Sequence, residues 1–222
     1  MNFEIKKRIM TSLILILLLI SMYFFSFIMI SALIIIATIT WIEFYTLITK
    51  VFKKKSIMNK FFRVLYKSLS LLYLSSLVFF IFLIESDYQY LKVCLFYSLL
   101  VAILSDIGGM LVGKTFKGKK LTKISPNKTI SGSCGSFIFS LLLIPPFYFE
   151  EFNKNLLLLI FITLIISMTS QLGDLFISYI KRKAKVKNTS DILPGHGGLL
   201  DRVDGIIFAI PVGLLLFNLF LI

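Results

Sequence analysis

This chain of 222 residues contains few cysteine, histidine and acidic residues. It contains two cysteines and one histidine. Cys94 and Cys134 lie far apart, within or beside apolar segments, so they provide neither a disulfide framework nor a cysteine metal site. The apolar run after Lys6, Lys7 and Arg8 continues past signal-peptide length without a small-residue cleavage site, which predicts that no leader is removed.

Acidic residues are scarce beside basic ones. Eleven Asp and Glu stand against 24 Lys and Arg, giving a formal net charge of +13. The basic residues form short clusters between apolar runs, with no folded polar module around them, so we predict no nucleic-acid partner. Membrane orientation and anionic lipid explain such clusters first.

Hydrophobic residues are abundant. They make up 58% of the chain, and its mean hydropathy is +0.93. Too little polar sequence remains to coat a soluble domain. We therefore predict an all-α polytopic membrane protein with about seven transmembrane helices. The predicted spans are two within residues 9–49, which meet between Ser21 and Ser31, and then 68–84, 90–112, 135–148, 155–180 and 199–221.

The charges between the predicted spans indicate their orientation. With the N-terminus in the cytoplasm, all strongly basic segments, including a loop over residues 50–67, fall on one side and both acidic turns on the other. Catalytic loops 113–134 and 181–200 then face the cytoplasm. We expect an N-terminal transmembrane region, 1–100, and a catalytic region, 101–222.

Two further features of the apolar segments have competing interpretations. Glu43, near the end of the second span, is either an interfacial residue or part of a buried polar network, and its position favours the interface. Residues 108–115, GGMLVGKT, fit the P-loop pattern G-x-x-x-x-G-K-T. A P-loop follows a strand and opens a helix, whereas this match straddles the end of a membrane span, so we reject it.

Two acids lie inside the predicted membrane region at matching depth. At about 1.5 Å per residue, Asp106 and Asp174 lie roughly 10 to 12 Å inward from Lys114 and Lys181. A carboxylate at that depth costs about 2.5 to 3.5 kcal/mol unless it faces a cation or a wet cavity. We therefore predict that both acids share one cation site.

Asp201 and Asp204 add to this predicted site from the start of the last span. Their spacing places both on one face of a helix, although acids at a helix start also serve as plain caps. Residues 194–198, PGHGG, precede that start, so their amides can point towards an anion. His196 lies between glycines, which favours contact with a phosphate or base over proton abstraction. Together these residues indicate a membrane enzyme that acts on a phosphorylated substrate.

From Ser178 the chain has Lys181-Arg182, then Lys187, and finally PGHGG at 194–198 followed by Asp201-Arg202-x-Asp204. This segment resembles the signature of the CDP-diacylglycerol synthases, or phosphatidate cytidylyltransferases. Asn188 departs from that signature, which usually has Asp there, so the role of that carboxylate is in question. The segments DIGG at 106–109 with GK at 113–114, ISPNKT at 124–129 and SQLGDL at 170–175 are similar to further segments of the family. Gly109 and Met110 depart from the Ala-Tyr that the family usually has there. The signature residues at the family spacing are Ser178, Lys181, Arg182, Lys187, Ser190, Pro194, Gly195, His196, Gly197, Gly198, Asp201, Arg202 and Asp204.

The resemblance implies transfer of a cytidylyl group from CTP to phosphatidate, giving CDP-diacylglycerol and pyrophosphate. It implies Mg²⁺ held by Asp106, Asp174, Asp201 and Asp204. The implied catalytic residues are Asp174, Asp201, Asp204, Lys181 and Arg182. The implied substrate-binding residues are Lys128, Ser178, Lys187, Gly195, His196, Gly197, Gly198 and Arg202.

Two other functions are weighed against this one. A CTP-dependent kinase of polyprenol or phytol type would use similar basic loops and intramembrane acids. An ion or phosphate transporter is less favoured, because the acids cluster at one face and no inverted repeat is apparent. We expect a bacterial inner membrane with the active site facing the cytoplasm, and the sequence leaves the oligomeric state open, a homodimer included.

Overall fold

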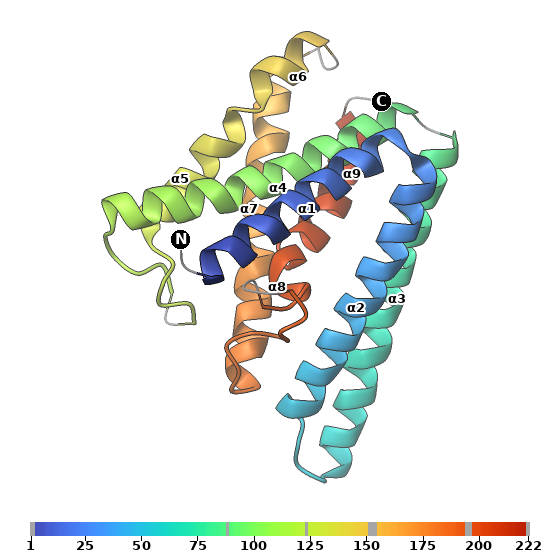
Figure 1. The fold of residues 1–222 in the computed structure, drawn as a ribbon, viewed down its shortest axis with the longest axis vertical. Coiled ribbons are helices and arrows are strands. Elements are labelled where there is room, and N and C mark those ends of the chain that lie inside the picture. The colour runs from blue at the N-terminus through green and yellow to red at the C-terminus, as the bar shows by residue number, and fades with distance from the viewer. Residues whose placement is uncertain (1–2, 88, 123, 151–154, 194–196, 221–222) are drawn as a thin grey trace. The chain divides into compact units, whose positions relative to one another are not determined.

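The described part of the chain in this computed structural model consists of helices joined by loops and turns, without strands (Figure 1). The structure describes residues 3–87, 89–122, 124–150, 155–193 and 197–220. Six described helical stretches are long and apolar enough to cross a membrane, and a shorter apolar one, Met10–Phe24, precedes them. The protein is therefore an all-α polytopic membrane protein, as predicted.

Contacts divide the chain into two compact units, each built from segments distant in sequence. The first unit comprises Met1–Asp87 and Ile180–Arg202, and the second comprises Tyr88–Tyr179 and Val203–Ile222. The predicted division near residue 100 separates an N-terminal transmembrane region from a catalytic region by function. The contact-based units do not test that division, which stays a prediction.

The first unit is built on two long helices, α2 (Ser26–Val51) and α3 (Ile57–Asp87), which lie side by side (Figure 1). The preceding helix α1 (Phe3–Phe24) contacts α2. Between α1 and α2, Phe25 has an extended backbone, with φ −122° and ψ 105°. Helices α1 and α2 therefore meet within the predicted boundary region between Ser21 and Ser31.

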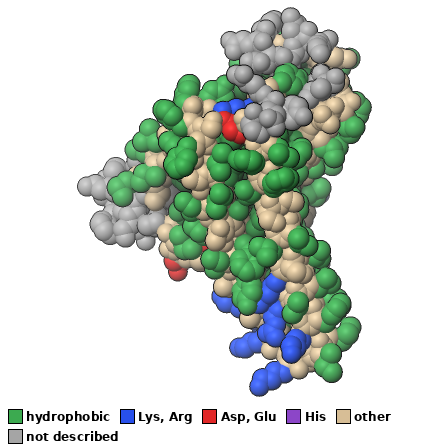
Figure 2. Space-filling view, turned by 90° about the vertical axis from the view of Figure 1, so that its right-hand side faces the viewer, with side chains coloured by type: hydrophobic (Ala, Val, Ile, Leu, Met, Phe, Trp, Pro, Cys, Tyr) green, Lys and Arg blue, Asp and Glu red, His purple; other side chains and the backbone are tan. Residues whose placement is uncertain are grey.

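The basic stretch after α2 is largely helical, which corrects the predicted loop over residues 50–67. Only residues 52–56 lie outside the helices. Lys60, Arg63 and Lys67 belong to α3, because straight-chain basic residues are good helix formers. Figure 2 shows Lys and Arg side chains at the lower end of one face, where Figure 1 places the α2–α3 connection, and hydrophobic side chains over much of the remainder.

The second unit is also helical, and α4 contacts both α5 and α9. The short helix α8 (Leu200–Val203) lies where the chain passes from the first unit to the second. The helices of the second unit are α4 (Gln89–Phe116), α5 (Ile130–Leu141), α6 (Ile144–Glu150), α7 (Leu156–Lys183, whose last residues belong to the first unit) and α9 (Ile206–Phe220).

Glycines line the contact between α4 and α5. A Cβ atom on Gly108 would lie 2.5 Å from the carbonyl oxygen of Gly135, and one on Gly135 would lie 2.4 Å from Cβ of Val112. Small residues let two membrane helices approach this closely. Residues 108–115 lie inside α4 and not in a loop, so the rejection of a P-loop is confirmed. The close packing of α4 against α5 explains why Gly108 of this motif is a glycine.

Two of the predicted spans, 135–148 and 199–221, correspond to stretches apolar enough to cross a membrane, and each of these stretches consists of two helices. In the fifth, α5 ends at Leu141 and α6 begins at Ile144. Pro145 and Pro146 lack backbone N–H groups, so they fit the first turn of a new helix but not a helix interior. In the last, residues 204 and 205 separate α8 from α9.

Hydroxyl groups connect α4 and α7 inside the second unit. The Tyr97 hydroxyl lies 2.6 Å from Oγ1 of Thr163, and the Ser105 and Ser167 hydroxyls lie 3.0 Å apart. All four side chains are buried. Such bonds satisfy polar groups that would otherwise lie unpaired in an apolar environment, and they fix the two helices against each other.

Candidate active site

A tight turn at the end of the loop between α4 and α5 positions Lys128. Lys128 N donates a hydrogen bond to the carbonyl oxygen of Ser125, at 3.1 Å, which closes a turn with Pro126 and Asn127 in its middle. Proline favours the second position of such a turn because its φ is already fixed there. The next residue, Thr129, caps α5 through its side chain. The chain is thus held firmly on both sides of Lys128.

Three predicted site residues come together in the second unit. Lys128 forms an ion pair with Asp174 of α7, and both side chains are partly exposed. Ser178, one turn later on α7, donates a hydrogen bond of 3.2 Å to the other carboxylate oxygen of Asp174. Asp106 lies exposed on α4 in the same unit. Asp174 therefore sits between an ammonium group and a hydroxyl group, with its charge balanced by Lys128.

Asp204 is a buried acid at the break between α8 and α9. Its residue is 4% exposed, and its carboxylate accepts a hydrogen bond of 2.9 Å from the amide of Gly205. A Cβ atom on Gly205 would lie 2.5 Å from Oγ of Ser170, and one on Gly173 would lie 2.9 Å from the carbonyl oxygen of Asp204. Two glycines thus let α7 and the break approach closely.

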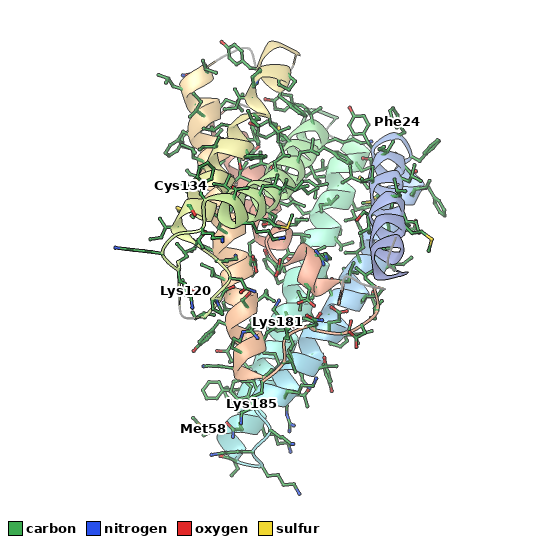
Figure 3. The ribbon with its side chains drawn as sticks, turned by 60° about the vertical axis from the view of Figure 1, so that its left-hand side comes forward. Phe24, Met58, Lys120, Cys134, Lys181 and Lys185 are labelled. Atoms are coloured by element: carbon green, nitrogen blue, oxygen red, sulfur yellow. The ribbon has the colours of Figure 1, made fainter. Side chains whose placement is uncertain are left out.

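A second lysine–aspartate pair lies in the first unit. Lys181, buried in the last turn of α7, approaches Asp201 to 2.7 Å (Figure 3). The other oxygen of Asp201 accepts hydrogen bonds from the amides of Thr189, at 2.9 Å, and Gly198, at 3.1 Å, and from the Thr189 hydroxyl at 3.0 Å. These donors fix the carboxylate, which in turn fixes the lysine ammonium group.

Glu43 belongs to the same cluster, which corrects its predicted interfacial position. Its side chain, on α2, is buried and accepts hydrogen bonds from Thr189, Ser190 and two backbone amides of the segment that follows. The sequence carried one usable signal, an acid inside an apolar helix, which is costly to bury without donors. The sequence did not show which donors these are.

The comparisons with known proteins place the chain in a family. The sequence model of the Cytidylyltransferase family matches residues 2–220. The chain belongs to the cytidylyltransferase family. A protein called phosphatidate cytidylyltransferase from Staphylococcus aureus (strain COL) is 46% identical over 118 residues, which are 52% of this chain and 45% of that protein.

Two further relatives carry the same name. The one from Rickettsia bellii (strain RML369-C) is 46% identical over 115 residues, or 48% of this chain and 50% of that protein. The one from Rickettsia prowazekii (strain Madrid E) is 42% identical over 140 residues, or 60% of each. The chain thus spans about half the length of the curated relatives it matches.

In this cytidylyltransferase-family chain, the remaining predicted basic residues are exposed. Arg182 lies in the last turn of α7, Lys187 in the segment after it, and Arg202 in α8. Their exposure is compatible with binding a phosphate, and their individual roles stay predictions. Pro194, together with the predicted substrate-binding residues Gly195 and His196, lies outside the described residues.

The two other glycines of the family signature are held in place by their neighbours. Gly197 has a φ of 85°, in the left-handed region that favours glycine, and its amide pairs with the carbonyl group of Leu193 at 3.2 Å. A Cβ atom on Gly197 would also lie 3.4 Å from the side chain of Asn188, the residue that departs from the signature. Local geometry accounts for glycine at 197, and any contact with substrate stays a prediction.

The acids of this family member provide the oxygen ligands that Mg²⁺ prefers, so the donor chemistry fits the ion. Asp106, Asp174 and Asp204 provide carboxylates in the second unit, and Asp201 provides one in the first. Asp174 is paired with Lys128 and Asp201 with Lys181. Among the residues that the structure describes, no three His, Cys, Asp or Glu side chains are grouped as a metal centre. The Mg²⁺ site stays a prediction.

Proposed function

We propose that this membrane protein transfers a cytidylyl group from CTP to phosphatidate, forming CDP-diacylglycerol and pyrophosphate. The observation that carries the proposal is the pair of positioned lysines. Lys128 and Lys181, both in segments similar to the family signature, are each held by an acid of the predicted site. An ammonium group fixed in this way is suited to neutralise a phosphate without having to reorganise.

The proposed reaction needs no strong protein base. The lipid phosphate is already ionised, so one of its oxygens attacks the α-phosphorus of CTP directly. A new phosphorus–oxygen bond forms, the bond from the α-phosphorus to the oxygen that bridges to the β-phosphate breaks, and the electron pair leaves with pyrophosphate. The protein's part is to orient both substrates and balance their charge.

The charged residues divide this work. Lys128 and Lys181, with exposed Arg182, Lys187 and Arg202, bind the triphosphate and the lipid phosphate. When bound, Mg²⁺ would supply further charge neutralisation at the phosphates. The acids that would hold the ion are Asp106, Asp174, Asp201 and Asp204.

The membrane supplies one substrate and water the other. Phosphatidate keeps its phosphate at the headgroup level, so a site near that level receives the lipid sideways while CTP enters from the aqueous side. We place the protein in a bacterial inner membrane with this site facing the cytoplasm. The basic segments and the bacterial relatives support that placement.

The deciding experiment follows label from CTP into lipid. Purified protein in detergent is given phosphatidate, Mg²⁺ and CTP labelled at either the α- or the γ-phosphate, with Asp204→Ala as the site variant. We expect only α-label to enter the lipid-extractable phase, pyrophosphate to appear in equal amount, and the variant to lose the transfer.

Other outcomes would redirect the assignment. Entry of γ-label alone, with release of CDP, would identify a CTP-dependent lipid kinase. Entry of neither label into the lipid of a folded sample would refute both reactions, and transport of ions or phosphate into vesicles would then be measured.

A further inference from the structure

Glu43 gathers four hydrogen bonds from one distant segment of the first unit. Its residue is 2% exposed. One carboxylate oxygen accepts from the Ser190 hydroxyl at 2.5 Å and the Leu199 amide at 3.0 Å. The other accepts from the Thr189 hydroxyl at 2.8 Å and the Leu200 amide at 2.7 Å. A buried carboxylate requires such donors, and here every one comes from residues 189–200.

These bonds fasten both ends of the glycine-rich segment. Thr189 and Ser190 stand at its start, and Leu199 and Leu200 stand at its end. One side chain on α2 therefore joins the described residues 189–193 to the described residues 197–200, and these two stretches are called the anchored loop below. The predicted substrate-binding residues Gly197 and Gly198 belong to it, and Gly195 and His196, which lie outside the described residues, fall between its two stretches in the sequence.

Gly198 shows how closely the loop fits around Glu43. A Cβ atom on Gly198 would lie 1.8 Å from the Thr189 hydroxyl oxygen and 2.7 and 2.9 Å from the two carboxylate oxygens of Glu43. No side chain fits at 198 unless this cluster moves. The glycine here is thus explained by its approach to Glu43, a constraint separate from any contact with substrate.

Thr189 connects Glu43 to the lysine–aspartate pair. Its hydroxyl lies within hydrogen-bond distance of both Glu43 and Asp201, and its amide donates to Asp201. Asp201 in turn holds the Lys181 ammonium group. A change at Glu43 is therefore transmitted through Thr189 and Asp201 to Lys181, a lysine that the proposed reaction uses.

We propose that Glu43 is a positioning residue for cytidylyl transfer, a role that rests on the proposed function. It holds residues 189 and 190 against residues 199 and 200, and it keeps the Lys181–Asp201 pair in register with them. It acts through the loop and touches neither CTP nor lipid. A residue that served the fold alone would change the amount of folded protein but not the kinetic constants of the folded fraction.

The test compares Glu43→Gln and Glu43→Ala with a matched control in the same unit. Glu85 of α3 accepts a hydrogen bond from Ser26 of α2, away from residues 189–200, so Glu85→Gln removes the charge of another acid on these helices. For each folded variant, kcat and KM for CTP are measured with phosphatidate and Mg²⁺. Hydrogen exchange of peptides covering residues 187–200 is measured in parallel.

We expect Glu43→Ala to raise amide exchange in residues 189–200 by at least about tenfold, because the anchored loop opens locally. We expect its kcat/KM for CTP to fall by at least about 30-fold, since misplacing bound groups weakens transition-state contacts. Glu43→Gln keeps the shape and one acceptor oxygen, so it should recover part of both losses. Glu85→Gln should stay within about twofold of wild type for kcat/KM, since it leaves the loop's anchor intact.

The outcomes separate this role from the proposed function. If Glu43→Gln and Glu43→Ala fold with wild-type kinetic constants, the positioning role is wrong, whatever the exchange shows. If Glu43→Ala does not fold, Glu43→Gln decides the question. The positioning role is then wrong if Glu43→Gln has both the amide exchange and the kcat/KM of the wild-type protein. If the wild-type protein transfers no cytidylyl group, the proposed function is wrong. In that case amide exchange still tests the structural part of the inference: exchange rates in both Glu43 variants equal to those of the wild type would show that Glu43 does not anchor the loop.

Discussion

Substituting Gly198 by alanine should damage the site by a predictable amount. The new Cβ atom would lie 1.8 Å from the Thr189 hydroxyl oxygen, whereas carbon and oxygen in ordinary contact stand well beyond 3 Å apart. To remove this overlap, the Thr189 hydroxyl and the new methyl group must move apart by on the order of 1.5 Å, which is more than the geometry of a hydrogen bond tolerates. The Thr189 hydroxyl must therefore leave Glu43, Asp201 or both.

The energetic cost follows from the groups that must move. Losing one hydrogen bond to a charged acceptor costs about 1.5 to 3 kcal/mol. Overpacking a buried position adds about 1 to 3 kcal/mol. We therefore expect a loss of roughly 2.5 to 6 kcal/mol. When about 2.7 kcal/mol or more of it falls on the catalytic arrangement, kcat/KM for CTP decreases by at least about 100-fold.

The assay combines cytidylyl transfer with thermal unfolding in detergent for Gly198→Ala, Thr189→Ala and the double variant. Removing the Thr189 hydroxyl makes room for the new methyl group, so the double variant should be much less impaired than the sum of the single variants predicts. Gly113→Ala in α4 is a milder comparison, because its Cβ atom would lie 3.1 Å from the Thr129 hydroxyl oxygen instead of 1.8 Å, so its loss of activity should be smaller. Strict additivity of the two single effects, or wild-type activity of Gly198→Ala, would refute the reasoning.

Three further predictions concern other parts of the molecule. Lys128→Met and Asp174→Asn should each reduce cytidylyl transfer by at least about tenfold, because each single change leaves one charge without its partner. The double variant should be less impaired than the sum of the two single effects predicts, and a double-mutant cycle measures the difference. Chelation of divalent ions should abolish transfer and added Mg²⁺ should restore it, whereas full activity in chelator would exclude the predicted metal. A maleimide in detergent should label exposed Cys134 and spare buried Cys94, as mass spectrometry of the labelled peptides can establish; equal labelling would contradict the packing of α4.

The membrane-spanning architecture was predictable because it depends on local properties of the chain. Hydropathy over about 20 residues identifies a span whatever its neighbours are. The boundary at Phe25 lay inside the predicted region. The two breaks within spans were not predicted, because the hydropathy runs through them without interruption. One lies between α5 and α6, just before Pro145 and Pro146, and the other lies between α8 and α9, at Asp204 and Gly205.

The sequence by itself determined that this is a membrane protein with a glycine-rich basic segment and with acids in its apolar segments, and the same residues indicated its family. Only the tertiary structure decided which charges pair: Lys128 with Asp174, and Lys181 with Asp201. It also moved Glu43 from a predicted interface to the centre of a hydrogen-bonded loop. The physical reason is distance along the chain: hydropathy and spacing report on neighbours, whereas the donors of Glu43 lie 146 to 157 residues away and reach it only through folding.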